Sequence, residues 1–181
     1  MNNNIRLAHI GEFAKIRAFY HEMTDWLDTV PYGPGWKKDI YPAPEDLENA
    51  INNQQLWVYE SDSGYAASMI LNSVPTEGYE NVVWRINASG DEVLLIHALG
   101  VRAEFQHRGI AKSMVNHAIG LAVSKNCKAM RLDVLEGNIP AENLYPKLGF
   151  YYVDTVNMFY EDTGWANYKL YERKLPLFPL F

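Results

Sequence analysis

A short turn between an apolar stretch and a helical one carries the residues best placed to bind an anion. It spans Gln106 to Ala111 and follows the apolar run that ends at Val101. The first amides of a helix have no partner within the helix and lie at the positive end of its dipole, so they can bind a phosphate. Gly109 allows a ligand to approach the backbone closely. The turn is not a Walker loop, since no Gly-Lys-Ser/Thr follows, nor a dinucleotide fingerprint. An ordinary strand-to-helix turn is the alternative.

The composition favours one compact domain with a sizeable core. The chain has 181 residues, of which 48% are hydrophobic and 21% charged, as is usual for a globular protein. We expect residues 1–175 to form a single domain, and residues 176–181 to form an apolar, proline-broken tail that docks on another surface. The net charge of −6 disfavours a nucleic-acid partner and mildly favours a cationic substrate.

The sequence lacks the usual marks of export, membrane insertion and metal binding. Its first residues have no apolar signal-peptide core, and no apolar run reaches membrane-spanning length, so we expect a cytoplasmic protein without a membrane partner. Cys127 is the only cysteine, which excludes a disulfide framework and a cysteine metal cluster. His9, His21 and His117 have no second ligand at metal spacing, so no metal is expected.

Apolar periodicity divides the chain into helices and strands. Apolar residues three and four apart predict helices, and short apolar runs between turn residues predict strands. The loop from Val30 to Pro44 is rich in Gly, Pro and aromatic residues. Strands are expected over 5–7, 56–60, 65–71, 81–87, 93–101, 130–135, 150–160 and 165–175, and helices over 11–27, 109–125, 140–148 and from Pro44. This order predicts a mixed α/β (α+β) domain without internal repeats.

Two stretches of the chain resemble a known family. The first is Leu99-x-Val101-x(4)-Gln106-x-x-Gly109-x-Ala111, and the second is Asn138-x-x-Ala141-x-x-Leu144-Tyr145-x-Lys147-Leu148-Gly149-Phe150. With the order of elements, they resemble the GNAT superfamily of acyl-CoA-dependent N-acyltransferases over residues 93–153. The resemblance implies a mixed, mostly antiparallel central sheet flanked by helices, in which the strands of 93–101 and 130–135 splay apart.

The resemblance also implies that acetyl-CoA lies in the gap between the splayed strands. Its pyrophosphate would lie on the amides of the turn, and its pantetheine arm would pair with the strand of 93–101. His107 and Arg108 would add positive charge there, or they would be solvated loop residues. Asn138 is also placed to cap the following helix. The residues expected to bind acetyl-CoA are Leu99, Gly100, Val101, Gln106, His107, Arg108, Gly109, Ile110, Ala111, Asn138, Ala141 and Tyr145.

Attack of an amine on a thioester needs an acid that protonates the leaving thiolate. Tyr145 matches the position of the tyrosine that faces the sulfur in family members, so it is the expected acid. Packing in a half-buried position is its alternative role. Pro146 disfavours helical geometry at the residue before it, and this would displace the Tyr145 ring.

The same reaction needs a base for the ammonium proton, and His97 is the candidate. Its segment resembles the one in which arylalkylamine acetyltransferases place a catalytic histidine, and imidazole titrates near neutrality. In a regular strand, Leu95, His97 and Leu99 would share one face. A hydrogen-bonded core histidine is an equal alternative, and Glu92, Glu104 or a water chain could supply the base instead.

The acceptor is expected to be a primary amine of a small molecule, attacked directly in a ternary complex. Cys127 falls far from the thioester, so it is expected to pack in the core and not to form an acyl-enzyme. Aromatic walls would suit an apolar body or a cation, although core filling is the alternative. A peptide or protein N-terminus, a non-catalytic acyl-CoA sensor and a homodimer are also left open. The residues expected to contact the acceptor are Tyr32, Trp36, Trp84, His97 and Phe159.

Overall fold

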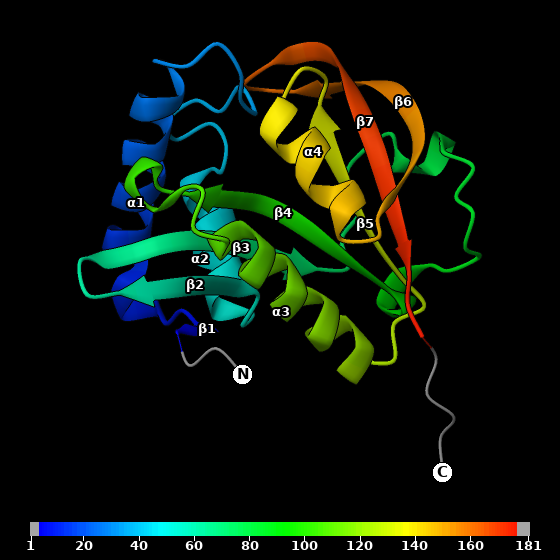
Figure 1. The fold of residues 1–181 in the computed structure, drawn as a ribbon, viewed down its shortest axis with the longest axis horizontal. Coiled ribbons are helices and arrows are strands. Elements are labelled where there is room, and N and C mark those ends of the chain that lie inside the picture. Colours follow the sequence, from blue (N-terminus) through cyan, green and yellow to red (C-terminus); the bar gives the residue numbers. More distant parts are fainter. Residues whose placement is uncertain (1–3, 177–181) are drawn as a thin grey trace.

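A computed structural model describes residues 4–176 of the chain (Figure 1). Most predicted elements are confirmed to within a few residues, while the expected docking of the apolar tail falls, apart from Pro176, outside the described residues. The strands are β1 (Ile5–Leu7), β2 (Leu56–Ser61), β3 (Gly64–Asn72), β4 (Val93–Val101), β5 (Ala129–Leu135), β6 (Tyr151–Tyr160) and β7 (Gly164–Lys174), and the helices are α1 (Phe13–Leu27), α2 (Pro44–Asn52), α3 (Ile110–Ser124) and α4 (Ile139–Lys147).

The strands form one seven-stranded sheet in the order β1-β2-β3-β4-β5-β7-β6. All neighbouring strands run antiparallel except β4 and β5, which are parallel. The crossover that joins these two parallel strands is α3, as parallel pairing requires. The predicted mixed, mostly antiparallel sheet is therefore confirmed.

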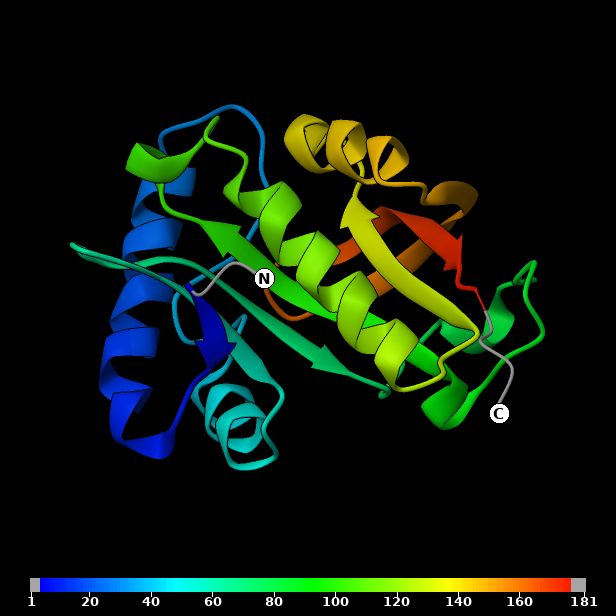
Figure 2. The ribbon, with the colours of Figure 1, turned by 60° about the horizontal axis from the view of Figure 1, so that its bottom comes forward.

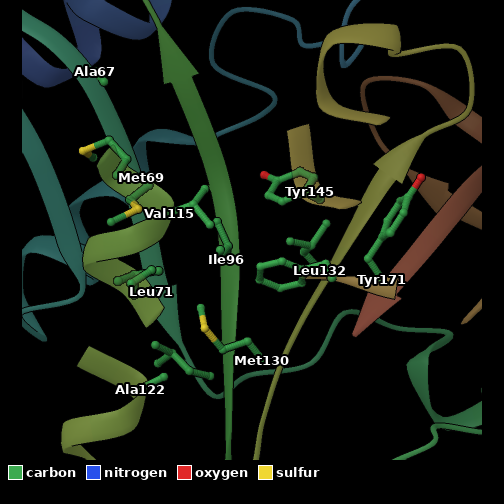
Figure 3. Close-up of a cluster of buried hydrophobic side chains, with 14 of the residues drawn as sticks. Ala67, Met69, Leu71, Ile96, Val115, Ala122, Met130, Leu132, Tyr145 and Tyr171 are labelled. Atoms are coloured by element: carbon green, nitrogen blue, oxygen red, sulfur yellow. The ribbon is translucent and has the colours of Figure 1, made fainter. Parts of the chain in front are cut away.

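Helices cover both faces of the sheet (Figure 2). On one face, α3 buries Met114, Val115 and Ala118 in a cluster with side chains of β3, β4 and β5 (Figure 3). On the other face, α1 buries Ile16 and Phe19 against β2 and β3, together with residues of α2. Each helix thus uses one apolar stripe, which is what the three-and-four spacing of its sequence predicts.

Strands β4 and β5 separate soon after they begin to pair. Only Val93, Leu94 and Leu95 of β4 lie in register with β5, opposite Ala129, Met130 and Arg131. Strand β5 instead pairs with β7 along its whole length. Among residues 4–176, the edge of β4 that faces β5 therefore has no strand partner from Ile96 onward, and the expected splay is confirmed.

The strand predicted over 81–87 is wrong. This segment is irregular after a short 3-10 turn at Tyr79–Asn81, because its backbone bonds to a buried ion pair. The Glu172 carboxylate accepts hydrogen bonds from the amides of Arg85 (3.0 Å) and Ile86 (3.1 Å). Arg131 pairs with Glu172 at 3.0 Å and donates to the carbonyls of Ile86 and Ala88. Such bonds satisfy the backbone N–H and C=O groups of the segment, so it needs no strand partner.

We expect Glu172→Gln to lower the free energy of unfolding by about 3–5 kcal/mol, because it leaves the charge of buried Arg131 without its partner. Glu172 is 0% and Arg131 7% exposed. Chemical denaturation measures the loss, and hydrogen exchange should show faster opening at the amides of Arg85 and Ile86. Exposed Glu77→Gln is the matched control. Equal stability of the two variants would contradict this account.

Candidate acetyl-transfer cleft

A bulge in β4 sets which side chains face the cleft. Ala98 has a φ of 50°, and the register against β3 shifts there, with Ser68 opposite Gly100 but Ile70 opposite His97. The extra residue reverses the faces that follow it. Leu99 consequently packs with the cluster under α3, while Leu95 belongs to a cluster on the opposite face. The expectation that Leu95, His97 and Leu99 share one face is therefore wrong.

A side chain of α1 holds the bulge from the face of the sheet opposite α3. The buried Tyr20 hydroxyl donates to the Ala98 carbonyl at 2.9 Å and lies 3.1 Å from Ser68 Oγ. Trp36 packs over the next part of the strand, since a Cβ on Gly100 would lie 3.3 Å from its ring. These contacts turn the irregular backbone into a fixed feature of the cleft wall.

The turn before α3 presents backbone amides without protein partners. Gly109 precedes the helix with a φ of 78°, and His107 has a φ of 60°. Among residues 4–176, no atom accepts a hydrogen bond from the amides of His107 to Lys112. Gln106 Nε2 donates to the Val101 carbonyl at 3.3 Å, which ties the turn to the end of β4. The side chain of Gln106 thus helps to shape the turn. The backbone amides of the turn are left available to bind an anion.

A cleft of about 400 Å³ runs from this turn along the gap between β4 and β5. It brings most of the predicted site together: Leu99, Gly100, Val101, Gln106, His107, Gly109, Ile110, Ala111, Asn138, Ala141 and Tyr145 from the acetyl-CoA set, and Tyr32, Trp36 and His97 from the acceptor set. Asn138 occupies the N-cap position of α4, but its side chain makes no capping hydrogen bond.

Three predicted residues do not line the cleft. The guanidinium of Arg108 lies over the ring of Phe105, 5.5 Å from its centre. Trp84 packs on the face of the sheet opposite α3, and the Arg131 guanidinium lies 4.4 Å from its ring centre. Phe159 is 53% exposed and packs against Trp165. Lys112, which sequence reasoning did not select, lines the cleft beside the turn.

Tyr145 reaches the cleft from α4. The helix continues through Pro146, so the expected displacement of the ring does not occur. The side chain is 6% exposed and packs against Phe150, and its hydroxyl forms no hydrogen bond within residues 4–176. In Figure 3 it lies between β4 and β5 with its oxygen turned toward β4. Burial and the charge of Asp133 raise its pKa, which keeps the hydroxyl protonated at neutral pH.

His97 also lines the cleft, but it is held by hydrogen bonds. Its Nε2 lies 3.1 Å from Asn72 Oδ1. Burial lowers the pKa of the ring to about 4, against the opposing effect of a hydrogen bond with the backbone of Val74. The imidazole is therefore neutral at neutral pH and is a weaker base than an exposed histidine.

Two aspartates of the cleft were missed by sequence reasoning. Asp133 lies in β5, where its Oδ2 accepts hydrogen bonds from the hydroxyls of Tyr79 (2.8 Å) and Tyr160 (2.9 Å). Asp162 lies in the turn between β6 and β7 and is 4% exposed. Burial raises the pKa of both carboxyl groups. Asp133 is a charged residue between apolar residues of a strand, and this pattern could have identified it as a candidate site residue.

The aromatic loop before α2 closes one end of the cleft against the β6–β7 turn. A Cβ at Gly35 would lie 2.7 Å from Thr163 Cγ2, so the loop and the turn are in close contact. Tyr41 packs edge-on against Tyr160 at 5.9 Å. The positive φ of Gly35, 77°, makes glycine the residue that fits this contact.

Cys127 lies in the core away from the cleft. It is 1% exposed, and burial raises the pKa of its thiol. No helix of the part of the chain that the structure describes is long and apolar enough to cross a membrane. Within that same part, no group of three or more His, Cys, Asp and Glu side chains could hold a metal ion.

Comparison with known proteins agrees with this geometry. Residues 20–150 match the Acetyltransferase (GNAT) family. The fold is similar to an acetyltransferase of the GNAT family from Streptococcus agalactiae 2603 (TM-score 0.77, 23% identity, 95% of each chain covered) and to one from Listeria monocytogenes 4b F2365 (0.72, 20%, 94% of each). It also resembles Arabidopsis thaliana NAA60 solved in complex with acetyl-CoA (0.64, 15%, 94% of this chain and 97% of that one).

The fold and the cleft therefore define an acyltransferase. The chain belongs to the GNAT family of acetyltransferases, which use acetyl-CoA as the acetyl donor.

Proposed function

We propose that this protein transfers an acetyl group from acetyl-CoA to the primary amine of a small molecule. The observation that carries the proposal is the unpaired edge of β4, which lies between the free amides of the α3 turn and the Tyr145 hydroxyl. An extended, amide-bearing arm needs such an edge, and a pyrophosphate needs such amides. The three features occur in one cleft.

The residues that would hold acetyl-CoA are those of the β4 edge and the turn. The backbone of Leu99 and Val101 would pair with the pantetheine arm, and the amides from His107 to Ala111 would bind the pyrophosphate. Lys112 would add positive charge beside the turn. Bound there, acetyl-CoA supplies an activated acetyl group as a thioester.

The reaction breaks the thioester C–S bond and forms an amide C–N bond. An acceptor that starts as an ammonium ion gives up two protons, of which one ends on the thiol and one is released. We assign the thiolate-protonating role to Tyr145, because its hydroxyl is protonated, faces the cleft and forms no hydrogen bond within residues 4–176. His97, acting directly or through water, is the proposed proton acceptor.

Direct transfer is proposed because no cysteine lines the cleft among residues 4–176. Cys127, which could form an acyl-enzyme, is buried elsewhere and its thiol pKa is raised, so little thiolate is available. Mass spectrometry of the protein incubated with acetyl-CoA should show no stable acetyl adduct on this residue. An adduct that turns over on addition of amine would contradict direct transfer.

The closed end of the cleft favours a small acceptor over a peptide. The contact of Gly35 with Thr163 and that of Tyr41 with Tyr160 hold the aromatic loop against the β6–β7 hairpin beside the cleft, and this closure is the support for a small acceptor. A thiol-release assay over a panel of small amines and short peptides tests this choice. Turnover with small amines supports the proposal, whereas turnover with peptides alone overturns it. Acetyl-CoA binding without turnover of any acceptor would favour the sensor alternative.

We expect the kcat/KM profile to lack a rising limb near pH 6.5, because the His97 ring stays neutral until the pH falls to about 4. His97→Gln should then lower kcat/KM by about 10- to 100-fold across pH 5.5–8 without changing the shape of the profile, at the lower end of general-base effects. His117→Gln, which changes a histidine outside the cleft, is the control. A limb near pH 6.5 that disappears in His97→Gln would show that the ring is protonated near neutrality.

A further inference from the structure

Asp133 offers one carboxylate oxygen to the cleft while the other is fixed. Two tyrosine hydroxyls donate to Oδ2, whereas Oδ1 accepts no hydrogen bond from any of residues 4–176. The tyrosines hold the carboxylate in one orientation, with Tyr160 also bonded to Thr76 at 3.2 Å. A fixed acceptor with a free oxygen is arranged to receive a hydrogen-bond donor.

Asp162 places a second carboxyl group in the same cleft. Its Oδ1 is enclosed and has no hydrogen-bond partner among the described residues, although the side chain lines the cleft. Burial raises the pKa of Tyr41 and of Tyr168, and the charges of Asp133 and Asp162 both add to the rise, so both carboxyl groups lie near the same two tyrosines. Neither aspartate forms a salt bridge with any Lys, Arg or His of residues 4–176.

Two carboxyl groups in one cleft, that of Asp162 buried and that of Asp133 half-buried, are costly in a folded protein when neither has a salt-bridge partner among residues 4–176. An unpaired buried charge destabilises the native state, and it persists where binding or catalysis requires it. A ligand cation would supply the missing partner. Aromatic rings of Trp36, Tyr41 and Tyr168 line the same space, and their faces also attract cations.

We propose that Asp133 and Asp162 bind the ammonium group of the acceptor, and that the acceptor is a basic amine without a carboxylate next to its amino group. This inference rests on the proposed function, because it names the acceptor class of that same cleft. A free amino acid brings a carboxylate to two uncompensated carboxylates, and like charges at close range oppose its binding. Decarboxylated amines lack this repulsion and keep the cation.

Matched pairs of acceptors test the proposal with the native enzyme. Tyramine is compared with tyrosine, and tryptamine with tryptophan, each by thiol release with acetyl-CoA. We expect kcat/KM for the amine to exceed that for its amino acid by about 100-fold or more, since several kcal/mol of repulsion are removed. Equal values within the pairs, or a preference for amino acids, would overturn the proposal.

Substitution of each carboxylate gives the second test. Asp133→Asn and Asp162→Asn should each lower kcat/KM for the best amine by about 10- to 100-fold, the usual effect of losing a hydrogen bond to a charged group. Glu161→Gln, at an exposed position beside Asp162, is the matched control. Native kcat/KM in either aspartate variant would overturn the two-carboxylate site.

Measurements of stability and of ligand binding distinguish a failure of this inference from a failure of the proposed function. Asp162→Asn should leave the thermal unfolding midpoint unchanged or raise it, because it removes a buried unpaired charge, whereas a merely structural Asp162 would lower the midpoint when replaced. Calorimetry in the presence of CoA compares tyramine and tyrosine without turnover. Loss of acetyl-CoA binding or of all turnover would count against the proposed function, while equal binding of tyramine and tyrosine would count against the inference.

Discussion

Gly109→Glu is expected to weaken acetyl-CoA binding by at least about 100-fold. The substitution places a carboxylate at the amides that precede α3, where it would bind these amides itself and repel a pyrophosphate. Like charges brought together at a binding site cost several kcal/mol, and each 1.4 kcal/mol is tenfold in affinity. A Cβ at Gly109 meets no atom within 4 Å, so the new side chain has room without disturbing the core. Isothermal calorimetry with acetyl-CoA measures the effect.

Two variants separate charge from backbone strain in this experiment. Gly109→Ala keeps the site uncharged but strains the backbone, since φ is 78°, and should weaken binding much less than the glutamate variant. Gly120→Glu introduces the same carboxylate at an exposed position of the same helix, where a Cβ is also unobstructed, and should bind acetyl-CoA normally. Native affinity in Gly109→Glu would mean that the phosphates lie elsewhere.

The path from β4 through the turn into α3 could be predicted because its signals are local. Apolar runs gave the strand and the helix, and Gly109 marked a backbone position that needs a positive φ. The order of elements predicted a mixed α/β domain, whereas the mostly antiparallel sheet and its splay came from the resemblance to the GNAT superfamily. The strand, the turn and the helix each depend on residues that are close in the sequence.

The features that sequence reasoning missed depend on distant residues. Segment 81–87 has strand-like residues, but its amides bond to Glu172, which lies far along the chain. The bulge at Ala98 is held by Tyr20, so the change of face at Leu99 has no local signal. Trp84 and Phe159 were chosen for their aromatic type, but they pack against Arg131 and Trp165 outside the cleft. Asp133 and Asp162 meet only when β5 and the β6–β7 turn come together.

Tyr145→Phe is expected to lower kcat by about 10²–10⁴-fold, the range of general acid–base groups, while acetyl-CoA binding changes little. The hydroxyl has no partner within residues 4–176, and the ring keeps its packing against Phe150, so the variant should fold normally. The contact matters mainly as charge develops on the departing sulfur, and its loss therefore appears in kcat. Steady-state kinetics measures kcat, and calorimetry measures the affinity for acetyl-CoA.

Tyr171→Phe is the control that removes the same atom from a neighbouring buried tyrosine. The two rings are 6.3 Å apart, but Tyr171 lies beyond β5 and does not line the cleft (Figure 3). It should keep native kcat, which would tie the loss to the hydroxyl that faces β4 and not to packing around α4. If Tyr145→Phe instead retains full activity, the thiolate takes its proton from water or another residue. The position of Tyr145 in the cleft would then reflect packing, and the acid assigned here would be wrong.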